Sequence, residues 1–405
     1  MCESERVKIA LKLTPTPPAN AFVSKEACNT KQDVFPLDVF FCENCTHLQL
    51  LDVVAPELLF SNYVYVSGTS SSFVRHFEQY ADEVARLTGP LKDVLVVDIG
   101  SNDGTLLRAF KERHGARVLG VDPARNLAEA ATAAGIETIA DFFTTKLAAG
   151  IAADHGRARV ITANNVFAHV DDLAGVAEGV RTLLAPDGVF VFEVSYLLDV
   201  VQKNLFDTIY HEHLSYHAVR PLIAFFERHG LELIEALRVP THGGSLRAIV
   251  QRSGGPRPRG VSVADALNAE AQGKLDRYDT YVQMATQIDH LRDELTALLR
   301  RLRSEGASVA GFGAPAKATT LMYHFGIGPD VMNFIVDDSP LKQGMFTPGM
   351  HIPVKSAKAI EQCKPDYLVI LAWNFAEAIV AKHQTYLDGG GRFVVPLPKI
   401  EVIAR

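Results

Sequence analysis

The sequence is poor in cysteine, lacks long hydrophobic runs and carries no excess of basic residues. Its five cysteines are an odd number in 405 residues and do not form a disulfide framework. No apolar run reaches the roughly 18–20 residues of a membrane span, and no signal-peptide hydrophobic region stands at the start. A formal net charge of −7 disfavours nucleic-acid binding, which needs Lys and Arg. We therefore expect a cytoplasmic protein without nucleic-acid or membrane partners.

The pattern of apolar residues predicts an α/β protein of several domains. The chain exceeds the length of one ordinary domain, and its composition is that of a globular protein. A Gly- and Pro-rich stretch at 254–260 is the clearest linker, and a long helix with apolar residues at three- and four-residue steps follows it. We divide the chain into a small N-terminal domain (1–66), an α/β domain (67–253), the linker with its long helix (254–304) and a second α/β domain (305–405).

Two stretches alternate between strands and helices, as doubly wound sheets do. The elements expected in the first are strands at 94–99, 118–121, 160–162 and 189–194 and helices at 74–87 and 105–113. Those expected in the second are strands at 308–311, 331–336 and 367–372 and a helix at 316–325. Each stretch is therefore predicted to be a Rossmann-like unit, and short strands at 35–41 and 48–54 precede both.

A glycine-rich turn at 97–105 joins a strand to a helix, and Asp122 ends the following strand about 20 residues later. A carboxylate at that spacing suits the hydroxyl groups of a ribose. The turn lacks the third glycine of G-x-G-x-x-G, so a cofactor with a ribose but no phosphate, such as S-adenosylmethionine, fits best. The bland alternative is a tight turn that happens to contain two glycines.

The segment 206–216 concentrates titratable side chains around Tyr210-His-Glu-His213. Histidines two residues apart do not form a His-Glu-x-x-His zinc site, but Tyr210 and His213 share one face of a helical turn. Histidine is a credible general base and a phenol can donate to a developing oxyanion. His169, after the strand at 160–162, lies at the sheet edge where ligands bind. The alternative is an aromatic-rich packing segment with Glu212 in solvent.

Two further motifs suggest a metal site and an anion site. Cys42-x-x-Cys45 lies among short strands, which favours a zinc ribbon, with Cys2 as the obvious third ligand and Cys28 or His47 as substitutes. The second glycine-rich turn, 311–317, has a proline placed to start a helix and ends in Lys317. It could hold the diphosphate of a sugar nucleotide, or it could be a vestigial Rossmann turn.

Five segments occur in a characteristic order: 97–107 (VDIGSNDGTLL), 165–170 (NVFAHV), 207–216 (DTIYHEHLSY), 242–247 (HGGSLR) and 311–319 (GFGAPAKAT). Together they resemble the three-domain S-adenosylmethionine-dependent sugar C-methyltransferases of deoxysugar pathways, particularly the C-3′-methyltransferase of the tetronitrose type. The resemblance implies a zinc-binding N-terminal domain, a Rossmann-like methyltransferase domain and a second Rossmann-like C-terminal domain. It also implies a TDP-linked 4-keto deoxysugar as substrate. Family members usually have two C-x-x-C pairs that hold Zn²⁺, whereas here Cys2 aligns with the second cysteine of the first pair and one expected cysteine ligand is missing.

The resemblance also implies roles for individual residues. His213 would remove a proton α to the ketone, and Tyr210 and His169 would steady the enolate. The other catalytic candidates are Tyr63 and Glu212. The expected cofactor-binding residues are Asp98, Gly100, Ser101, Asn102, Gly104, Asp122, Pro123, Phe142, Asn164 and Asn165. The expected substrate-binding residues are Tyr65, His242, Gly243, Ser245, Arg247, Gly313, Ala314 and Lys317. The expected metal ligands are Cys2, Cys42 and Cys45.

Two other functions remain open at this point. One is an NAD(P)-dependent oxidoreductase or epimerase of nucleotide sugars, which the incomplete glycine motifs disfavour. The other is a non-catalytic protein that binds nucleotide sugars. The sequence leaves open which sugar carbon is methylated (C-3 or C-5), whether the sugar carries an amino group, and the oligomeric state, with a monomer as one alternative.

Overall fold

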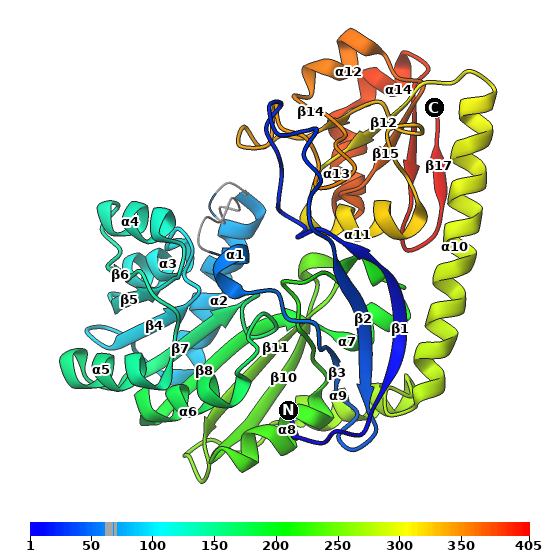
Figure 1. Ribbon diagram of the computed structural model, residues 1–405. Helices are drawn as coiled ribbons and strands as arrows, with labels where there is room; N and C mark the ends of the chain where they lie inside the picture. The colour runs from blue at the N-terminus through cyan, green and yellow to red at the C-terminus, as the bar shows by residue number, and fades with distance from the viewer. Residues whose placement is uncertain (61–67, 69–70) are drawn as a thin grey trace.

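The computed structural model describes residues 1–60, 68 and 71–405, except the side chains of 71, 72 and 242. This part of the chain forms three sheets with helices packed around them (Figure 1). The N-terminal sheet has the order β1-β2-β3-β9 and the central sheet has the order β10-β11-β8-β7-β4-β5-β6. The C-terminal sheet has the order β14-β13-β12-β15-β16-β17. Within the described residues, no helix has the length and apolar character to cross a membrane.

The N-terminal sheet is antiparallel and takes one strand from the middle of the chain. Its strands are β1 (Val7–Thr16), β2 (Phe35–Cys42), β3 (Leu48–Leu50) and β9 (Ser215–Tyr216). The strand expected at 48–54 ends early, because β3 is followed by exposed residues and then by α1 (Pro56–Phe60). Since β9 directly follows the segment with Tyr210 and His213, this sheet is attached to that segment by backbone hydrogen bonds.

The central sheet is parallel from β6 to β8, and β11 pairs antiparallel with β8 and β10. Its strands are β4 (Leu95–Ile99), β5 (Arg117–Val121), β6 (Thr138–Ile139), β7 (Ala158–Asn164), β8 (Leu184–Ser195), β10 (Leu231–Val239) and β11 (Ser245–Arg252). The chain runs from β4 outward to β6 and returns at β7 on the other side of β4. The strand order therefore reverses between β4 and β7, which is where open α/β sheets bind ligands.

Helices cover both faces of this sheet, so its central strands are buried on both sides. Val96 packs in one core with residues of α2 (Ser71–Thr88) and α3 (Thr105–His114). Its neighbour Val97 packs in the other core with residues of α5 (Thr145–His155) and α6 (Leu173–Leu183). The remaining helices of this part are α4 (Arg125–Ala133), α7 (Leu197–Gln202) and α8 (Val219–Arg228).

The C-terminal sheet repeats the reversal of strand order. Its strands are β12 (Val309–Phe312), β13 (Ile335–Val336), β14 (Val354–Lys355), β15 (Tyr367–Ile370), β16 (Arg392–Val395) and the antiparallel β17 (Glu401–Ile403). Its helices are α11 (Ala316–Phe325), α12 (Lys358–Cys363), α13 (Ala376–Lys382) and α14 (Gln384–Asp388). The expected strand at 331–336 is confined to its last two residues, because Val331 and Met332 are buried within a turn. The order reverses between β12 and β15, so a second ligand edge is expected there.

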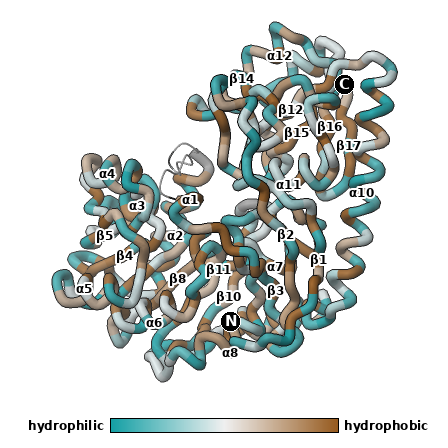
Figure 2. Tube along the Cα trace, viewed as in Figure 1, coloured by the Kyte–Doolittle hydropathy of each residue, from teal (hydrophilic) through white to brown (hydrophobic). Residues whose placement is uncertain are grey.

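A long helix, α10 (Tyr278–Ser304), runs beside the N-terminal sheet and reaches the C-terminal sheet (Figure 1). Its buried residues include Tyr281, Ile288, Leu295 and Leu302, which follow helical spacing as expected. In Figure 2 hydrophobic and hydrophilic residues alternate along α10. The segment before it is less of a linker than expected, because it contains the helix α9 (Val261–Gln272).

Candidate active site

The first glycine-rich turn lies at the carboxyl end of β4, at the reversal of strand order. Gly100 and Gly104 have φ values of +67° and +74°, a conformation in which a side chain is strained. A Cβ atom on Gly100 would overlap the side chain of Val166, in the loop after β7. A Cβ atom on Gly104 would lie 2.9 Å from Ile136. The two glycines therefore let the turn pack tightly against both neighbouring loops.

Two buried carboxylates hold this turn in place. Asp122, at the end of β5, accepts hydrogen bonds from the backbone N–H groups of Asn102 and Ala124, both at 2.8 Å. Asp98, in β4, accepts a hydrogen bond of 2.6 Å from the hydroxyl of Thr162. Burial raises the pKa of Asp98 to about 7, although the Thr162 hydrogen bond opposes the shift. The charge of Asp122 raises the pKa of Asp98 further.

These residues fit a nucleoside cofactor. Each oxygen of the Asp122 carboxylate keeps a second lone pair for a ribose hydroxyl group. The hydroxyl of Ser101 is buried in the turn and has no hydrogen-bond partner among the described residues. A buried polar atom without a partner is costly, and a ligand in this crevice would supply one. Asn164 and Asn165 end β7 at the same edge, whereas Pro123 and Phe142 follow β5 and β6.

The catalytic candidates meet because the segment 213–215 is attached to the loop after β7. The backbone N–H groups of Leu214 and Ser215 donate to the carbonyl of Ala168 at 2.8 and 3.1 Å. This places the imidazole rings of His169 and His213 at 4.9 Å between centroids. The rings of Tyr210 and His213 are 4.1 Å apart, as their three-residue spacing predicts.

Hydrogen bonding and burial set the proton positions in this cluster. Nδ1 of His213 lies 2.7 Å from the carbonyl oxygen of Thr208. A carbonyl only accepts, so Nδ1 carries a proton and Nε2 holds the lone pair of the neutral ring. Burial keeps the pKa of His169 well below its ordinary value, and the neighbouring imidazole of His213 lowers it further. Nε2 of His169 is buried without a partner among the described residues.

His211 and Glu212 point toward other parts of the molecule. Nε2 of His211 donates to the carbonyls of Phe35 and Pro36, at 3.3 and 3.0 Å, and so attaches the segment to β2. The Glu212 side chain is 1% exposed and accepts a 2.7 Å hydrogen bond from the Asn20 amide. These contacts indicate that Glu212 supports the segment, and they argue against our assignment of it as a catalytic residue.

The second glycine-rich turn lies at the carboxyl end of β12. The N–H of Ala314 donates to Asp337, at the end of β13, at 2.7 Å, which repeats the contact between Asn102 and Asp122 in the central sheet. Nζ of Lys317 is 2.6 Å from the side-chain oxygen of Asn374 and 3.7 Å from the centre of the Trp373 ring. Burial lowers the pKa of Lys317 to about 8, and the charge of Asp207 limits the fall.

Sequence reasoning missed several residues at this edge. Asp337 carries the same signal as Asp122, an acid that ends the strand after a glycine-rich turn, and the same rule could have found it. Trp373 and Asn374 follow β15 at the reversal of strand order, but no motif marks them. Lys342 donates to the carbonyl of Ala314 at 2.8 Å, and no sequence signal points to it.

Two residues of the 242–247 segment, Ser245 and Arg247, have partners within the protein. Arg247 is 4% exposed and forms ion pairs with Glu193, at 2.5 Å, and with Glu83. Its guanidinium also packs on the Tyr80 ring. Because these partners occupy Arg247, we correct its assignment as a substrate-binding residue. Ser245 is also fully buried and donates to the carbonyl of Thr241.

Some expected residues lie outside the described part of the structure. They are Tyr63, Tyr65 and the side chain of His242. The carbonyl of the neighbouring Gly243 accepts a 2.5 Å hydrogen bond from Lys203. The Cα atom of Gly243 lies beside the Trp373 ring.

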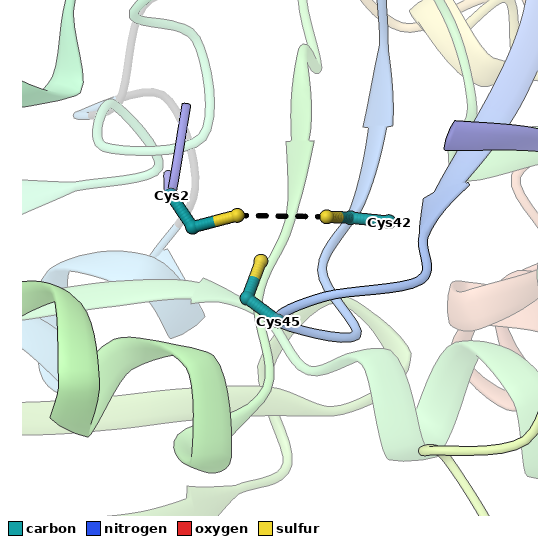
Figure 3. A group of neighbouring side chains, drawn as sticks. All are labelled: Cys2, Cys42 and Cys45. Carbon is teal, nitrogen blue, oxygen red and sulfur yellow. Dashed lines mark hydrogen bonds between the residues drawn. The ribbon is translucent and has the colours of Figure 1, made fainter. Parts of the chain in front are cut away.

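The sulfur atoms of Cys2, Cys42 and Cys45 lie within 4.8 Å of one another (Figure 3). Cys2 and Cys42 are 3.5 Å apart between sulfurs, near the roughly 3.8 Å that Zn–S bonds of about 2.3 Å give in a tetrahedral site. Among the described residues, this group contains no fourth ligand. His47, considered as a substitute, instead contacts Ser215 through Nε2 at 3.2 Å, and the Cys28 thiol donates to the carbonyl of Lys25.

The central sheet, its glycine-rich turn and the acids at its strand ends define a Rossmann-like enzyme whose sheet edge suits a nucleoside cofactor. Comparison with known proteins specifies the class. Three family models match consecutive parts of the chain: "Putative zinc binding domain" (1–60), "Methyltransferase domain" (73–236) and "C-methyltransferase C-terminal domain" (240–398). The last model takes in β11, α9 and α10 together with the strands β12 to β16 of the C-terminal sheet.

The chain is similar over nearly its whole length to the C-methyltransferase NovU of Streptomyces niveus. The two are 38% identical over 389 residues, which are 96% of this chain and 92% of NovU. The chain therefore belongs to the three-domain C-methyltransferase family, and it is an S-adenosylmethionine-dependent C-methyltransferase.

Other similarities concern only part of the chain. A ubiquinone biosynthesis O-methyltransferase of Colwellia psychrerythraea is 28% identical over 156 residues, 36% of this chain and 63% of that protein. The solved magnesium protoporphyrin IX methyltransferase of Synechocystis is 15% identical, with a TM-score of 0.34 over 45% of this chain and 81% of that one. We draw nothing from a structural likeness of this size.

Proposed function

We propose that this enzyme methylates a carbon next to the ketone of a TDP-linked 4-keto deoxysugar, with or without an amino group, and that His213 is the general base. The observation that carries the proposal is the hydrogen bond from Nδ1 of His213 to the carbonyl of Thr208. It orients the ring and leaves the lone pair on Nε2, as removal of a C–H proton requires.

Three side chains of the protein carry out the proton transfer and stabilise the enolate. Nε2 of His213 takes the proton from the carbon α to the ketone, and the electrons of the C–H bond move onto the ketone oxygen. The Tyr210 hydroxyl donates a hydrogen bond to that oxygen as its charge develops, and His169, neutral at pH 7, adds a second polar contact. The first glycine-rich turn, with Asp122 and Ser101, would hold S-adenosylmethionine, which would supply an electrophilic methyl group to the α carbon and leave as S-adenosylhomocysteine.

The edge of the C-terminal sheet provides a place for the nucleotide part of the substrate. Lys317 and Lys342 bring two ammonium groups to the turn at Gly313 and Ala314, and Asp337 lies beside it. Such a turn and its cations suit a diphosphate, and the acid at the end of the strand suits a ribose. The catalytic segment 206–213 contacts this edge through Asp207.

Enzyme assays and calorimetry test this function. With S-adenosylmethionine and a panel of TDP-4-keto-deoxysugars, we expect the wild type to give a product one methyl group heavier. His213→Asn should lower that rate by about 10²–10⁴-fold while retaining S-adenosylhomocysteine binding. Methyl transfer at the wild-type rate by His213→Asn would refute the base assignment. Tight binding of NAD(P) without binding of S-adenosylhomocysteine would favour an oxidoreductase.

We further propose that Cys2, Cys42 and Cys45 bind a structural Zn²⁺ ion that holds the start of the chain against the turn after β2. Thiolate ligands select zinc, and such sites contribute folding free energy. Metal analysis should find about one zinc ion per chain. Cys42→Ser should lose the metal and melt at a lower temperature, whereas the control Cys363→Ser, on α12, should do neither. A metal-free wild type with unchanged melting in chelator would contradict the proposal.

A further inference from the structure

Three segments far apart in sequence meet at Trp373, the single tryptophan of the chain. Its indole N–H donates to the Asp207 carboxylate at 2.5 Å. The ammonium group of Lys317 lies 3.7 Å from the centre of its ring. A Cβ atom on Gly243 would be 3.0 Å from the ring edge. Trp373 therefore contacts the catalytic segment, the turn after β10 and the second glycine-rich turn.

The buried carboxylate of Asp207 needs the hydrogen bond from the Trp373 indole. Its carboxylate is completely buried, and one of its two oxygens has no partner among the described residues. A buried carboxylate is costly unless it is hydrogen-bonded or paired. Its other oxygen accepts the hydrogen bond from the indole N–H. Burial raises the pKa of Asp207, and the charge of Lys317 and the indole hydrogen bond oppose this shift. The position of residue 207 is therefore tied to Trp373.

The position of residue 207 also affects His213. Asp207 is the middle residue of the short helix η2 (Phe206–Thr208). The carbonyl of Thr208, the last residue of η2, accepts the hydrogen bond from Nδ1 of His213. A second contact supports the same turn, because the hydroxyl of Thr320 on α11 donates to the carbonyl of Ile209 at 2.6 Å. The contact of Trp373 with Asp207 and the contact of Thr320 with Ile209 both come from the C-terminal sheet and its helices.

We propose that Asp207 and Trp373 are positioning residues that hold the Thr208 carbonyl where it selects the Nδ1–H form of His213. Through this pair, the C-terminal domain controls the orientation and basicity of the catalytic histidine. The inference rests on the proposed function, which makes His213 the base. It gives the C-terminal domain a part in proton transfer in addition to binding the nucleotide.

Trp373→Phe is the direct test, because it removes the N–H donor and keeps an aromatic ring beside Lys317. We expect kcat for methyl transfer to fall by about 10- to 100-fold, since small misplacements of a catalytic group have effects of this size, with KM for S-adenosylmethionine unchanged. Nitrogen-15 NMR of the His213 ring, assigned by comparison with His213→Asn, should show one tautomer in the wild type. In Trp373→Phe it should show a mixture.

Conservative and control variants separate positioning from folding. Asp207→Asn keeps an oxygen that can accept from the indole and should stay within about threefold of wild-type kcat, whereas Asp207→Ala should behave like Trp373→Phe. Tyr278→Phe removes a different contact between domains, the 2.7 Å hydrogen bond to the carbonyl of Ile9, and should change neither kcat nor the tautomer. If Trp373→Phe does not fold, Thr320→Val takes its place with the same expected tautomer shift.

The outcomes separate this inference from the proposed function. If Trp373→Phe keeps wild-type kcat and a single His213 tautomer, the positioning role is wrong even when His213→Asn is inactive. If His213→Asn remains active, the base assignment fails, whereas the NMR measurement still decides whether Asp207 and Trp373 orient the ring.

Discussion

At the scale of single residues, hydrogen-bond partners distinguish the four side chains of the segment 210–213. His211 and Glu212 bond to β2 and to Asn20, whereas His213 packs on Tyr210 and on His169. The spacing in sequence could predict that Tyr210 and His213 share a face. It could not predict the Thr208 carbonyl, because that contact depends on how the short helix η2 turns back on the segment.

Tyr210→Phe tests the expected oxyanion contact. The variant keeps the ring that packs on His213 and removes one hydroxyl. We expect kcat for methyl transfer to fall by about 100- to 1,000-fold, the range for loss of one donor to a developing oxyanion, with S-adenosylhomocysteine affinity and melting temperature unchanged. Steady-state kinetics with calorimetry measure this. An unchanged kcat would remove Tyr210 from the oxyanion site.

At the scale of secondary-structure elements, ion pairs between buried side chains connect strands and helices of the central sheet. Glu193 on β8 is 2% exposed and pairs with Arg247 on β11 and with His76 on α2. These bonds connect β8 and β11 to α2. The sequence showed Arg247 only as part of a family motif, so its partners on other elements were not predictable.

Arg247→Met should therefore affect stability more than substrate recognition. Removing one partner of a buried ion pair costs about 3–5 kcal/mol, which denaturant unfolding should detect. KM for the sugar should stay unchanged. In the double variant Glu193→Gln with Arg247→Met, much of the lost stability should return, because no buried carboxylate is left without its arginine. A raised KM without loss of stability would restore Arg247 to the substrate site.

The burial of Lys317, at the turn between β12 and α11, predicts that the affinity for TDP depends on pH. Lys317 is surrounded by the Trp373 ring, Asn374 and the charge of Asp207, and burial lowers its pKa to about 8. The ammonium form predominates below this pKa and is lost above it. Affinity for TDP should therefore be constant near pH 7 and weaken as the pH rises through about 8, far below the ordinary lysine pKa.

Substitutions at Lys317 identify the titrating group. Lys317→Met should bind TDP weakly at every pH, whereas Lys317→Arg should retain its affinity above pH 8 because arginine stays charged. Lys358→Met, on the exposed start of α12, serves as the control. Calorimetry between pH 6.5 and 9.5 measures the affinity, and a wild-type profile without this decline would exclude Lys317 from the phosphate site.

At the scale of the whole molecule, the strand order reverses once in each of the two mainly parallel sheets, and the segment 206–216 connects these two edges. Periodicity and glycine-rich turns could predict both Rossmann-like units, because buried parallel strands and strand-to-helix turns have strong local signatures. The addition of β9 to the N-terminal sheet and the contact between Asp207 and Trp373 were not predictable. Both join residues more than 150 positions apart through tertiary packing.

The central claim is that His213 removes a proton next to the ketone of a nucleotide-linked sugar. Incorporation of deuterium measures this step directly. The enzyme is incubated in D₂O with S-adenosylhomocysteine and TDP-4-keto-6-deoxyglucose, and the sugar is analysed by mass spectrometry and NMR. We predict that the wild type incorporates one deuterium next to the ketone and that His213→Asn does not exceed the rate without enzyme. Equal incorporation by wild type and His213→Asn would contradict the account.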